Sequence, residues 1–318
     1  MSDLDVLLQQ LVTGLSNGMI IALIALGYTM VYGIVELINF AHGDLFMLGS
    51  FLALTILGAL GMEQWSGLGA GAGVILMLFS SALFCGGVNW LVDRWAYRPL
   101  RQASKLSLLV AAIGCSFIIV NLGLFWGGLP MEVFSNGVAA AAPKDFPDLL
   151  PRGNLLGDSQ VQVGWDGLII VAVTVPLMVG LTLFVKRTRL GKAMRAVAQN
   201  QTAARLMGID VDRVIGSTFF IGGALGGFAS VVYALYNNTI SFQMGYRAGM
   251  DAFTAAVLGG IGSLPGAVLG GISIGVLRSM SDQYIETRWT NSIVFAVLIL
   301  VLVFRPSGIL GASGREKV

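Results

Sequence analysis

The stretch AFTAAVLGGIGSLPGAVLGGISIGVL, from Ala252 to Leu277, holds 26 consecutive residues without a charged side chain. Seven of them are glycines, and Pro265 lies near the middle, within GSLPG (262–266). Glycine and proline clustered in this way interrupt a helix. We therefore expect this stretch to enter a membrane and return as two short halves. The alternative is one packing helix, in which glycines four residues apart let a neighbouring helix approach closely, as at 262/266, 266/270 and 271/275.

Seven further uncharged stretches flank this one. Charged residues make up only 11% of the chain and hydrophobic residues 56%, whereas a typical soluble domain has about 25% charged residues. A helix needs about 20 apolar residues to cross a bilayer, so most of the stretches can span one. The sequence predicts an all-α, polytopic integral membrane bundle in a single domain (1–318), with about eight spans, one of them broken or re-entrant. The other stretches are Val6 to Val35, Leu45 to Met62, Gln64 to Val92, Leu106 to Met131, Gly167 to Val185, Val214 to Tyr246 and Trp289 to Phe304.

The distribution of charge orients these spans. Basic residues exceed acidic ones by three in 93–105 and by five in 186–213, whereas acidic residues exceed basic ones by three in 132–166. Loops rich in Lys and Arg stay on the cytoplasmic side, so the first two segments should face the cytoplasm and the loop 132–166 the opposite side. Eight unbroken spans would place the three basic residues after residue 304 on the wrong side. A break within 252–277 removes this conflict.

The cytoplasmic segment 186–213 is predicted to form two short helices. The first covers 190–198; Asn200 can cap the second, Gly208 can close it, and Asp210 can cap the next span. A basic amphipathic helix at this place could lie on anionic lipid. Its many small residues instead offer a flat surface to another protein, which favours a docking role. These small residues are Gly191, Ala193, Ala196, Ala198, Ala203, Ala204 and Gly208.

A second polar segment, ELINFAHGD (36–44), lies between the first two stretches. It is either a solvated turn, in which Asn39 or Asp44 caps a helix, or a functional segment inside the membrane. A single histidine, His42, cannot build a metal site. The residues of interest are Glu36, Asn39, His42, Gly43 and Asp44.

The sequence shows no catalytic or energy-converting motif. Gly191-Lys192 lacks both the earlier glycine and the following Ser or Thr of a phosphate-binding loop. Cys85 and Cys115 match no metal-ligand spacing, and a net charge of +2 gives no reason to expect a nucleic-acid partner. An enzyme is therefore disfavoured, and an ion channel is disfavoured because charged rings and filter repeats are missing. Energy for transport would have to come from a partner or an ion gradient.

An ion-coupled secondary transporter is the main alternative, because broken helices are common in that class. Proton-coupled carriers usually keep Asp, Glu or His inside the membrane, and the eight stretches contain none. A sodium site built from backbone carbonyls is still compatible with the sequence. Carbonyls and helix ends beside Gly259, Gly260, Gly262 and Pro265 are candidates for contact with a small polar or amphipathic solute.

Three runs, GYTMVYGIVELINFAHGDLFMLGSF (27–51), VLGGIGSLPGAVLGG (257–271) and FRPSGILG (304–311), carry a family resemblance. They resemble the high-affinity branched-chain amino-acid permeases of bacteria, specifically the shorter of two paralogous permease subunits. The resemblance covers nearly the whole chain. In addition, Thr202-Ala203-Ala204-x-x-x-Gly208 is similar to the loop Glu-Ala-Ala-x-x-x-Gly by which permeases of ATP-binding-cassette importers engage their ATPases, with Thr202 in place of Glu.

The resemblance implies a subunit of an inner-membrane importer of leucine, isoleucine and valine. It implies a longer paralogous permease, two ATPase subunits that bind ATP and Mg, a periplasmic amino-acid-binding protein, and no cofactor in this chain. Related permeases transport urea, short amides and other amino acids. The resemblance therefore specifies the class of transporter more narrowly than it specifies the substrate. The implied ATPase-coupling residues are Gly191, Lys192, Arg195, Thr202, Ala203, Ala204, Gly208 and Arg213. The implied pathway and gating residues are Glu36, Asn39, His42, Gly43, Asp44, Gly259, Gly260, Gly262, Pro265 and Gly266.

Overall fold

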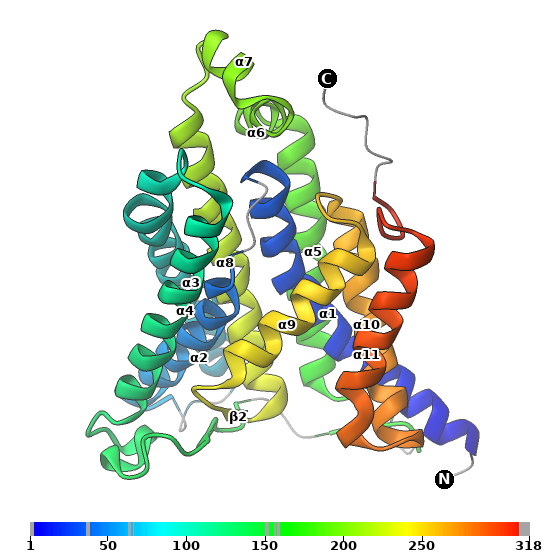
Figure 1. Cartoon of the computed structure of the whole chain (residues 1–318). Helices are drawn as coiled ribbons and strands as arrows, with labels where there is room; N and C mark the ends of the chain where they lie inside the picture. Colours follow the sequence, from blue (N-terminus) through cyan, green and yellow to red (C-terminus); the bar gives the residue numbers. More distant parts are fainter. Residues whose placement is uncertain are drawn as a thin grey trace.

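A computed structural model describes residues 3–35, 39–62, 65, 67–149, 153–155, 157 and 160–311. These residues form a bundle of long helices (Figure 1). Eight helices among them are long and apolar enough to cross a membrane, which confirms the predicted all-helical membrane architecture. In chain order they are α1 (Asp3–Val35), α2 (Ala41–Ala59), α3 (Leu68–Val92), α4 (Lys105–Gly127), α5 (Trp165–Arg187), α8 (Val211–Asn237), α10 (Leu264–Tyr284) and α11 (Thr287–Phe304).

The predicted interruption lies at residues 260–263, between α9 (Met244–Gly259) and α10. Gly260 follows the last residue of α9 with a φ of 107°, a conformation that a residue with a side chain rarely adopts. Ser263 caps α10, because its hydroxyl accepts a hydrogen bond from the Gly266 amide at 3.2 Å. The break is therefore confirmed at the position that the glycine and proline cluster indicates.

The two helices that flank the break are longer than the short halves expected from the sequence. α10 has 21 residues and is itself long enough to span a membrane, and α9 has 16, or about 24 Å. α9 also starts before Arg247 and Asp251, the charges that limit the uncharged stretch. The Asp251 carboxylate is tolerated in the interior of α9 because it forms an ion pair with Arg278 of α10.

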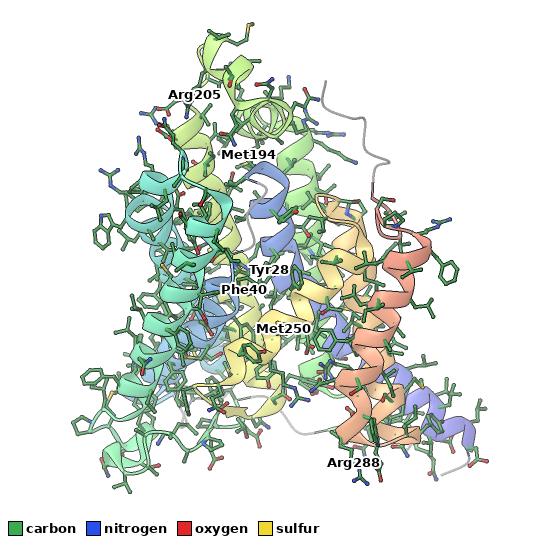
Figure 2. The ribbon with its side chains drawn as sticks, in the orientation of Figure 1. Tyr28, Phe40, Met194, Arg205, Met250 and Arg288 are labelled. Atoms are coloured by element: carbon green, nitrogen blue, oxygen red, sulfur yellow. The ribbon has the colours of Figure 1, made fainter. Side chains whose placement is uncertain are left out.

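α1 begins at one end of the bundle, and α11 ends at the other (Figure 1). The short helices α6 (Arg189–Gln199) and α7 (Gln201–Leu206) lie at the same end as the C-terminal segment, whereas Arg288 lies at the other end (Figure 2). The basic segment 186–213 therefore shares one side with Arg305, as the charge distribution requires. The other two C-terminal basic residues, 315 and 317, lie outside the described residues.

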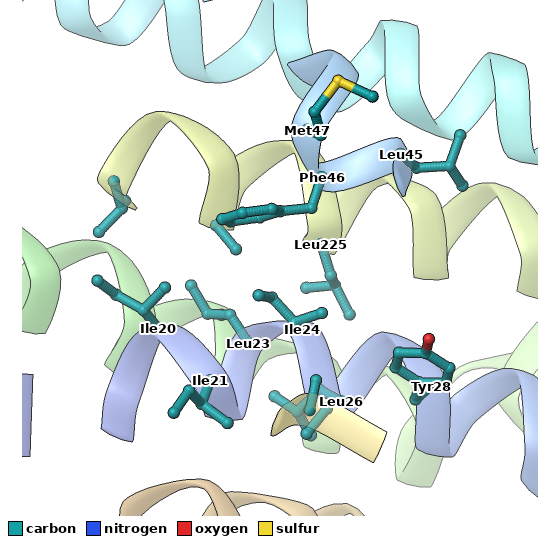
Figure 3. Close-up of a cluster of buried hydrophobic side chains, with 14 of the residues drawn as sticks. Ile20, Ile21, Leu23, Ile24, Leu26, Tyr28, Leu45, Phe46, Met47 and Leu225 are labelled. Atoms are coloured by element: carbon teal, nitrogen blue, oxygen red, sulfur yellow. The ribbon is translucent and has the colours of Figure 1, made fainter. Parts of the chain in front are cut away.

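α1, α2 and α8 form the centre of the bundle. Between 72% and 78% of their most apolar windows is buried, against 17% in α4, α5 and α11. Figure 3 shows Phe46 of α2 facing Ile20 and Ile24 of α1, and Leu225 of α8 belongs to the same buried cluster. The outer helices carry their apolar side chains outward, which suits contact with lipid.

α1 packs against α10 through glycines on both helices. A Cβ atom built on Gly18 would lie 2.7 Å from the Cα of Ile272, and one built on Gly271 would lie 2.6 Å from the Cα of Ala22. The two backbones are thus closer than any side chain at these positions would allow, as in other small-residue contacts between membrane helices. The glycine-rich stretch therefore combines both interpretations: its first half holds the break and its second half packs closely.

The acidic segment 132–166 lies at the end opposite α6 and α7 (Figure 1), as predicted. Lys144 anchors its described part: the side chain is 3% exposed, and its Nζ donates to three carbonyls of residues 134–139 at 3.1 to 3.4 Å. The same residue begins β1 (Lys144–Asp145), a two-residue strand that pairs antiparallel with β2 (Thr239–Ile240). This outer segment is therefore tied to the chain between α8 and α9.

Replacement of Gly18 by valine should destabilise the bundle, because the added atoms would overlap the α10 backbone. We expect a loss of more than about 2 kcal/mol in the free energy of unfolding, measured in detergent with the purified chain. Gly180→Val on α5 is the matched control, since a Cβ there meets nothing within 4 Å. Equal stability of the two variants would contradict the close α1–α10 contact.

Cysteine labelling from each side of the membrane should place residues 288 and 306 on opposite faces. In a background without Cys85 and Cys115, Arg288→Cys should react with an impermeant maleimide in intact cells, and Pro306→Cys only in inverted vesicles. The physical reason is that α11 crosses the membrane once between them. Labelling of both from one face would show that the described topology is wrong.

Candidate functional site

The described part of the polar segment 36–44 is buried in the bundle. Asn39 is 2% exposed, and His42 and Asp44, which lie in the first turn of α2, are each 1% exposed. The solvated-turn interpretation is therefore wrong for these three residues, because neighbouring helices enclose them. Glu36 lies outside the described residues.

Asn39 connects the start of α2 to two other helices. Its Nδ2 donates to Oδ1 of Asn89 on α3 at 3.2 Å, and its Oδ1 accepts from the hydroxyl of Tyr97 at 2.7 Å. Asn89 in turn donates to the backbone carbonyl of Phe219 on α8 at 2.6 Å. Since buried amides lose free energy when they are unpaired, this chain of bonds fixes the α1–α2 connection against α3 and α8.

His42 is held by packing. Its ring meets Tyr28 of α1 edge to face, with 4.7 Å between ring centroids. A Cβ atom on Gly27 would lie 2.5 Å from its Nε2, so the glycine makes room for the imidazole. Neither ring nitrogen makes a hydrogen bond within the described part of the chain. The described residues contain no group of three His, Cys, Asp or Glu side chains that could hold a metal.

Asp44 lies where α2, α4 and α9 meet. Its Oδ2 accepts a hydrogen bond from Ser116 of α4 at 2.5 Å, and its Oδ1 has no partner among the described residues. A Cβ atom on Gly245 would lie 2.8 Å from that oxygen, and one on Gly43 would lie 2.7 Å from the Cα of Gly249. Small residues therefore let α9 touch α2 directly beside a half-satisfied carboxylate.

The break between α9 and α10 is sealed by the C-terminal segment. The amides of Ile309 and Leu310 donate to the carbonyls of Leu258 and Gly259, both at 2.9 Å. These two carbonyls at the end of α9 are thus already paired. A Cβ atom on Gly33 of α1 would lie 3.3 Å from the Cα of Gly262. The three runs that carry the family resemblance therefore come together around this turn.

The remaining predicted residues of this turn are glycines and a proline. Gly262 adopts a φ of 87°, Pro265 occupies the first turn of α10, and Gly266 donates its amide to the cap. Each serves the reversal of the chain. Their part in a solute pathway stays a prediction.

The segment 186–213 folds as the capping residues predict. Thr188 caps α6, Asn200 caps α7 and Asp210 caps α8, each through a side-chain oxygen that accepts an amide at 3.0 Å. Gly208, with a φ of 81°, ends α7. The two short helices and the start of the next span are therefore confirmed.

The exposed surface of this segment differs from the flat alanine surface that the sequence predicts. Gly191 is buried: a Cβ there would lie 2.6 Å from the carbonyl oxygen of Phe184 on α5. Ala204 is also buried, whereas Leu206 and Met207 are 85% and 82% exposed. Sequence reasoning missed these two residues, which follow Arg205 where α7 ends. Figure 1 shows α7 at the outer end of the bundle. Lys192, Arg195, Thr202, Ala203 and Arg213 are exposed.

An ion-pair network links the start of α8 to the end of α3. Asp212 pairs with Arg98 at 2.9 Å and with Arg101, and Arg101 also pairs with Asp93 at 2.6 Å. The Asp93 side chain is 4% exposed and that of Arg101 13% exposed. Separating these buried ion pairs would cost free energy, so a displacement of α7 that moves the start of α8 would also move the end of α3.

Titratable side chains lie in the membrane-spanning helices, contrary to the sequence argument that these regions contain none. The error arose because His42, Asp44 and Asp93 lie at helix ends that the sequence assigned to loops. Asp251 lies in the interior of α9, and Arg278 lies in the last third of α10. The spacing of Arg247 and Asp251, four residues apart in a small-residue segment, is the signal that could have revealed α9.

Replacement of Arg101 by glutamine should destabilise the chain strongly, because it leaves the buried Asp93 carboxylate without its cation. We expect a loss of about 3 to 5 kcal/mol in the free energy of unfolding in detergent. Arg213→Gln is the control: this guanidinium is 84% exposed and pairs with Asp210 at 3.7 Å, so its loss should cost less than about 1 kcal/mol. Similar losses in both variants would refute the role of the network.

Comparison with known proteins agrees with this architecture. The chain matches the family described as "Branched-chain amino acid transport system / permease component" over residues 10–303. It is 40% identical to the high-affinity branched-chain amino acid transport system permease protein BraD of Pseudomonas aeruginosa, over 98% of both chains. It is also 40% identical to the LivH permease proteins of Salmonella typhimurium and Escherichia coli, over 98% of this chain and 97% of each relative.

No solved structure matches the chain. The sequence matches nevertheless cover nearly all of it, including the segment 186–213 and the break between α9 and α10. The resemblance predicted from the three short runs is thereby confirmed. The chain belongs to the family of branched-chain amino acid transport permeases, which are multi-pass membrane components of transport systems.

Proposed function

We propose that the chain is a transmembrane permease subunit of an ATP-binding-cassette importer of leucine, isoleucine and valine. A periplasmic binding protein delivers the amino acid, and two separate ATPase subunits hydrolyse Mg-bound ATP. A longer paralogous permease completes the membrane core. The names of the relatives, which describe permeases of high-affinity branched-chain amino acid transport systems, support the substrate and the class of transporter.

The observation that carries this proposal is the exposed tip of α7. Leu206 and Met207 present apolar surface at the end of the bundle that the basic residues mark as cytoplasmic. An isolated membrane protein gains nothing from two such side chains in water, and exposed apolar residues rimmed by charge are typical of protein interfaces. The tip is therefore the docking surface for an ATPase, and the exposed residues Lys192, Arg195, Thr202, Ala203, Gly208 and Arg213 belong to the same segment, in which Gly191 and Ala204 are buried.

The link from this tip to the pathway runs through the start of α8. When the ATPases close on ATP, α6 and α7 move with them, and Asp212 follows because it begins the next helix. Its pairs with Arg98 and Arg101 pass the displacement to α3. α3 carries Asn89, which holds Asn39. The polar segment that starts α2 is thus shifted by an event at the tip, and this shift gates the pathway.

An ion-coupled secondary transporter is the second candidate, and one observation favours it. Asp44 is buried with one oxygen unpaired among the described residues, which is the arrangement expected of a proton relay. Uptake into proteoliposomes distinguishes the two. The importer requires ATP and the binding protein, whereas a carrier works with an ion gradient alone. Uphill uptake of leucine by the isolated chain in an ion gradient would refute the importer.

Introduction of charge at the tip should uncouple the transporter. In the assembled importer, the double variant Leu206→Asp, Met207→Asp should lower ATP-dependent leucine uptake at least about tenfold, because each aspartate removes an apolar contact and adds a desolvation cost. The variant should still insert into the membrane, since both side chains are exposed. Thr287→Asp, an exposed residue at the opposite end, is the control. Normal uptake by the double variant would discredit the docking assignment.

A further inference from the structure

A cavity of about 420 Å³ lies among α1, α2, α8, α9 and α10. Its volume falls in the range of roughly 300 to 1,000 Å³ that small-molecule sites occupy. It includes Asn237 at the end of α8 and Met244 at the start of α9. The cavity therefore lies in the half of the bundle away from α6 and α7, toward the side from which solute would arrive.

Part of the cavity is apolar. Ile20 and Ile24 of α1 and Phe46 of α2 contribute to its lining, and these side chains are 3%, 1% and 0% exposed (Figure 3). They belong to the central cluster of the bundle, so packing on several sides holds them in place. An aliphatic side chain of a ligand placed against them would be shielded from water without any rearrangement of the helices.

The charged part of the cavity comes from the other two helices. α9 contributes Arg247 and Asp251, and α10 contributes Arg278 and Asp282. The two arginines and two aspartates balance, so the cavity is formally neutral yet carries both signs. A charged ligand of either sign would be repelled by half of these groups, whereas a zwitterion can be satisfied by both.

The four charges are not equally free. Arg278 is engaged by Asp251 and donates to Asn291 at 2.8 Å, so this pair holds α9 and α10 together. Arg247 makes no ion pair or hydrogen bond within the described ranges. Its guanidinium is thus the available donor, and guanidinium binds carboxylate with two parallel hydrogen bonds.

Asp282 supplies the opposite charge. Its Oδ1 accepts from the hydroxyl of Thr290 at 2.5 Å, which fixes the carboxylate in orientation. Its Oδ2 makes no hydrogen bond in the described part of the chain. An ammonium group placed in the cavity could bind this oxygen. Asn17 of α1, which also lines the cavity, offers an amide oxygen.

We propose that this cavity binds the amino acid in transit, as a zwitterion with an aliphatic side chain. Arg247 binds the carboxylate, Asp282 binds the ammonium, and Ile20, Ile24 and Phe46 contact the side chain. The inference rests on the proposed function and adds the site that the permease itself offers to the substrate. It differs from the predicted contact at the end of α9, where the carbonyls are paired with the C-terminal segment.

The test uses the complete importer in proteoliposomes, with wild-type binding protein, ATP and radiolabelled leucine. Arg247→Gln and Asp282→Asn should each lower uptake at a fixed concentration of loaded binding protein at least about tenfold, because each removes a charge-assisted hydrogen bond to the substrate. ATP hydrolysis stimulated by the binding protein should persist. Arg247→Lys should retain part of the uptake, because the positive charge remains without the paired geometry.

Arg288→Gln is the matched control, since this arginine lies at the same end of the bundle, is 75% exposed, and does not line the cavity. Uptake by Arg247→Gln and Asp282→Asn within twofold of the wild type would overturn the cavity while leaving the importer intact. Absence of ATP-dependent uptake by the wild-type importer would instead refute the proposed function. Loss of stimulated ATP hydrolysis together with uptake in both variants would show that the two residues act on coupling, and would also overturn the assignment.

Discussion

The structure depends on pairing polar side chains with one another in a region that offers them no water. An unpaired charge or amide in hydrocarbon is costly, so a helix that carries one must lie against a helix that carries its partner. Asp251 pairs with Arg278, Asp212 pairs with Arg101, and Asn39 pairs with Asn89. Each of these pairs joins segments that apolar packing alone would leave free to slide, because lipid is as apolar as leucine.

Close packing at glycines also holds the helices together. Where α1 meets α10 and where α2 meets α9, the backbones touch, so dispersion contacts replace the hydrophobic driving force that a membrane lacks. The result is a closely packed centre of α1, α2 and α8, with ion pairs and hydrogen bonds between helices toward both ends. The ion pairs at the end that carries α6 and α7 link the end of α3 to the start of α8, and the pair of Asp251 and Arg278 lines the cavity at the other end. In the mechanism that we propose, a partner moves the first set of contacts while the second set holds the solute.

The features that sequence reasoning predicted correctly are local ones. The caps at Asn200 and Asp210 and the break beside the glycine and proline cluster (262–266) depend on residues within a few positions of one another, so the sequence alone indicates them. The first half of α9 was missed because the partner of Asp251, Arg278, lies 27 residues away. Without that partner, a charged residue was taken as the end of a span. The exposure of Leu206 and Met207 was missed for a similar reason, since only the folded position of α6 shows which side of α7 is covered.

The most direct test of this account is a double-mutant cycle on Asp251 and Arg278, with the free energy of unfolding measured in detergent. Each single change to alanine leaves one buried charge unpaired and should cost about 3 to 5 kcal/mol, whereas the double change removes both charges and should cost clearly less than the sum. A coupling energy of more than about 2 kcal/mol is the expected result. Strict additivity of the two changes would contradict the claim that interhelical polar pairs hold this bundle together.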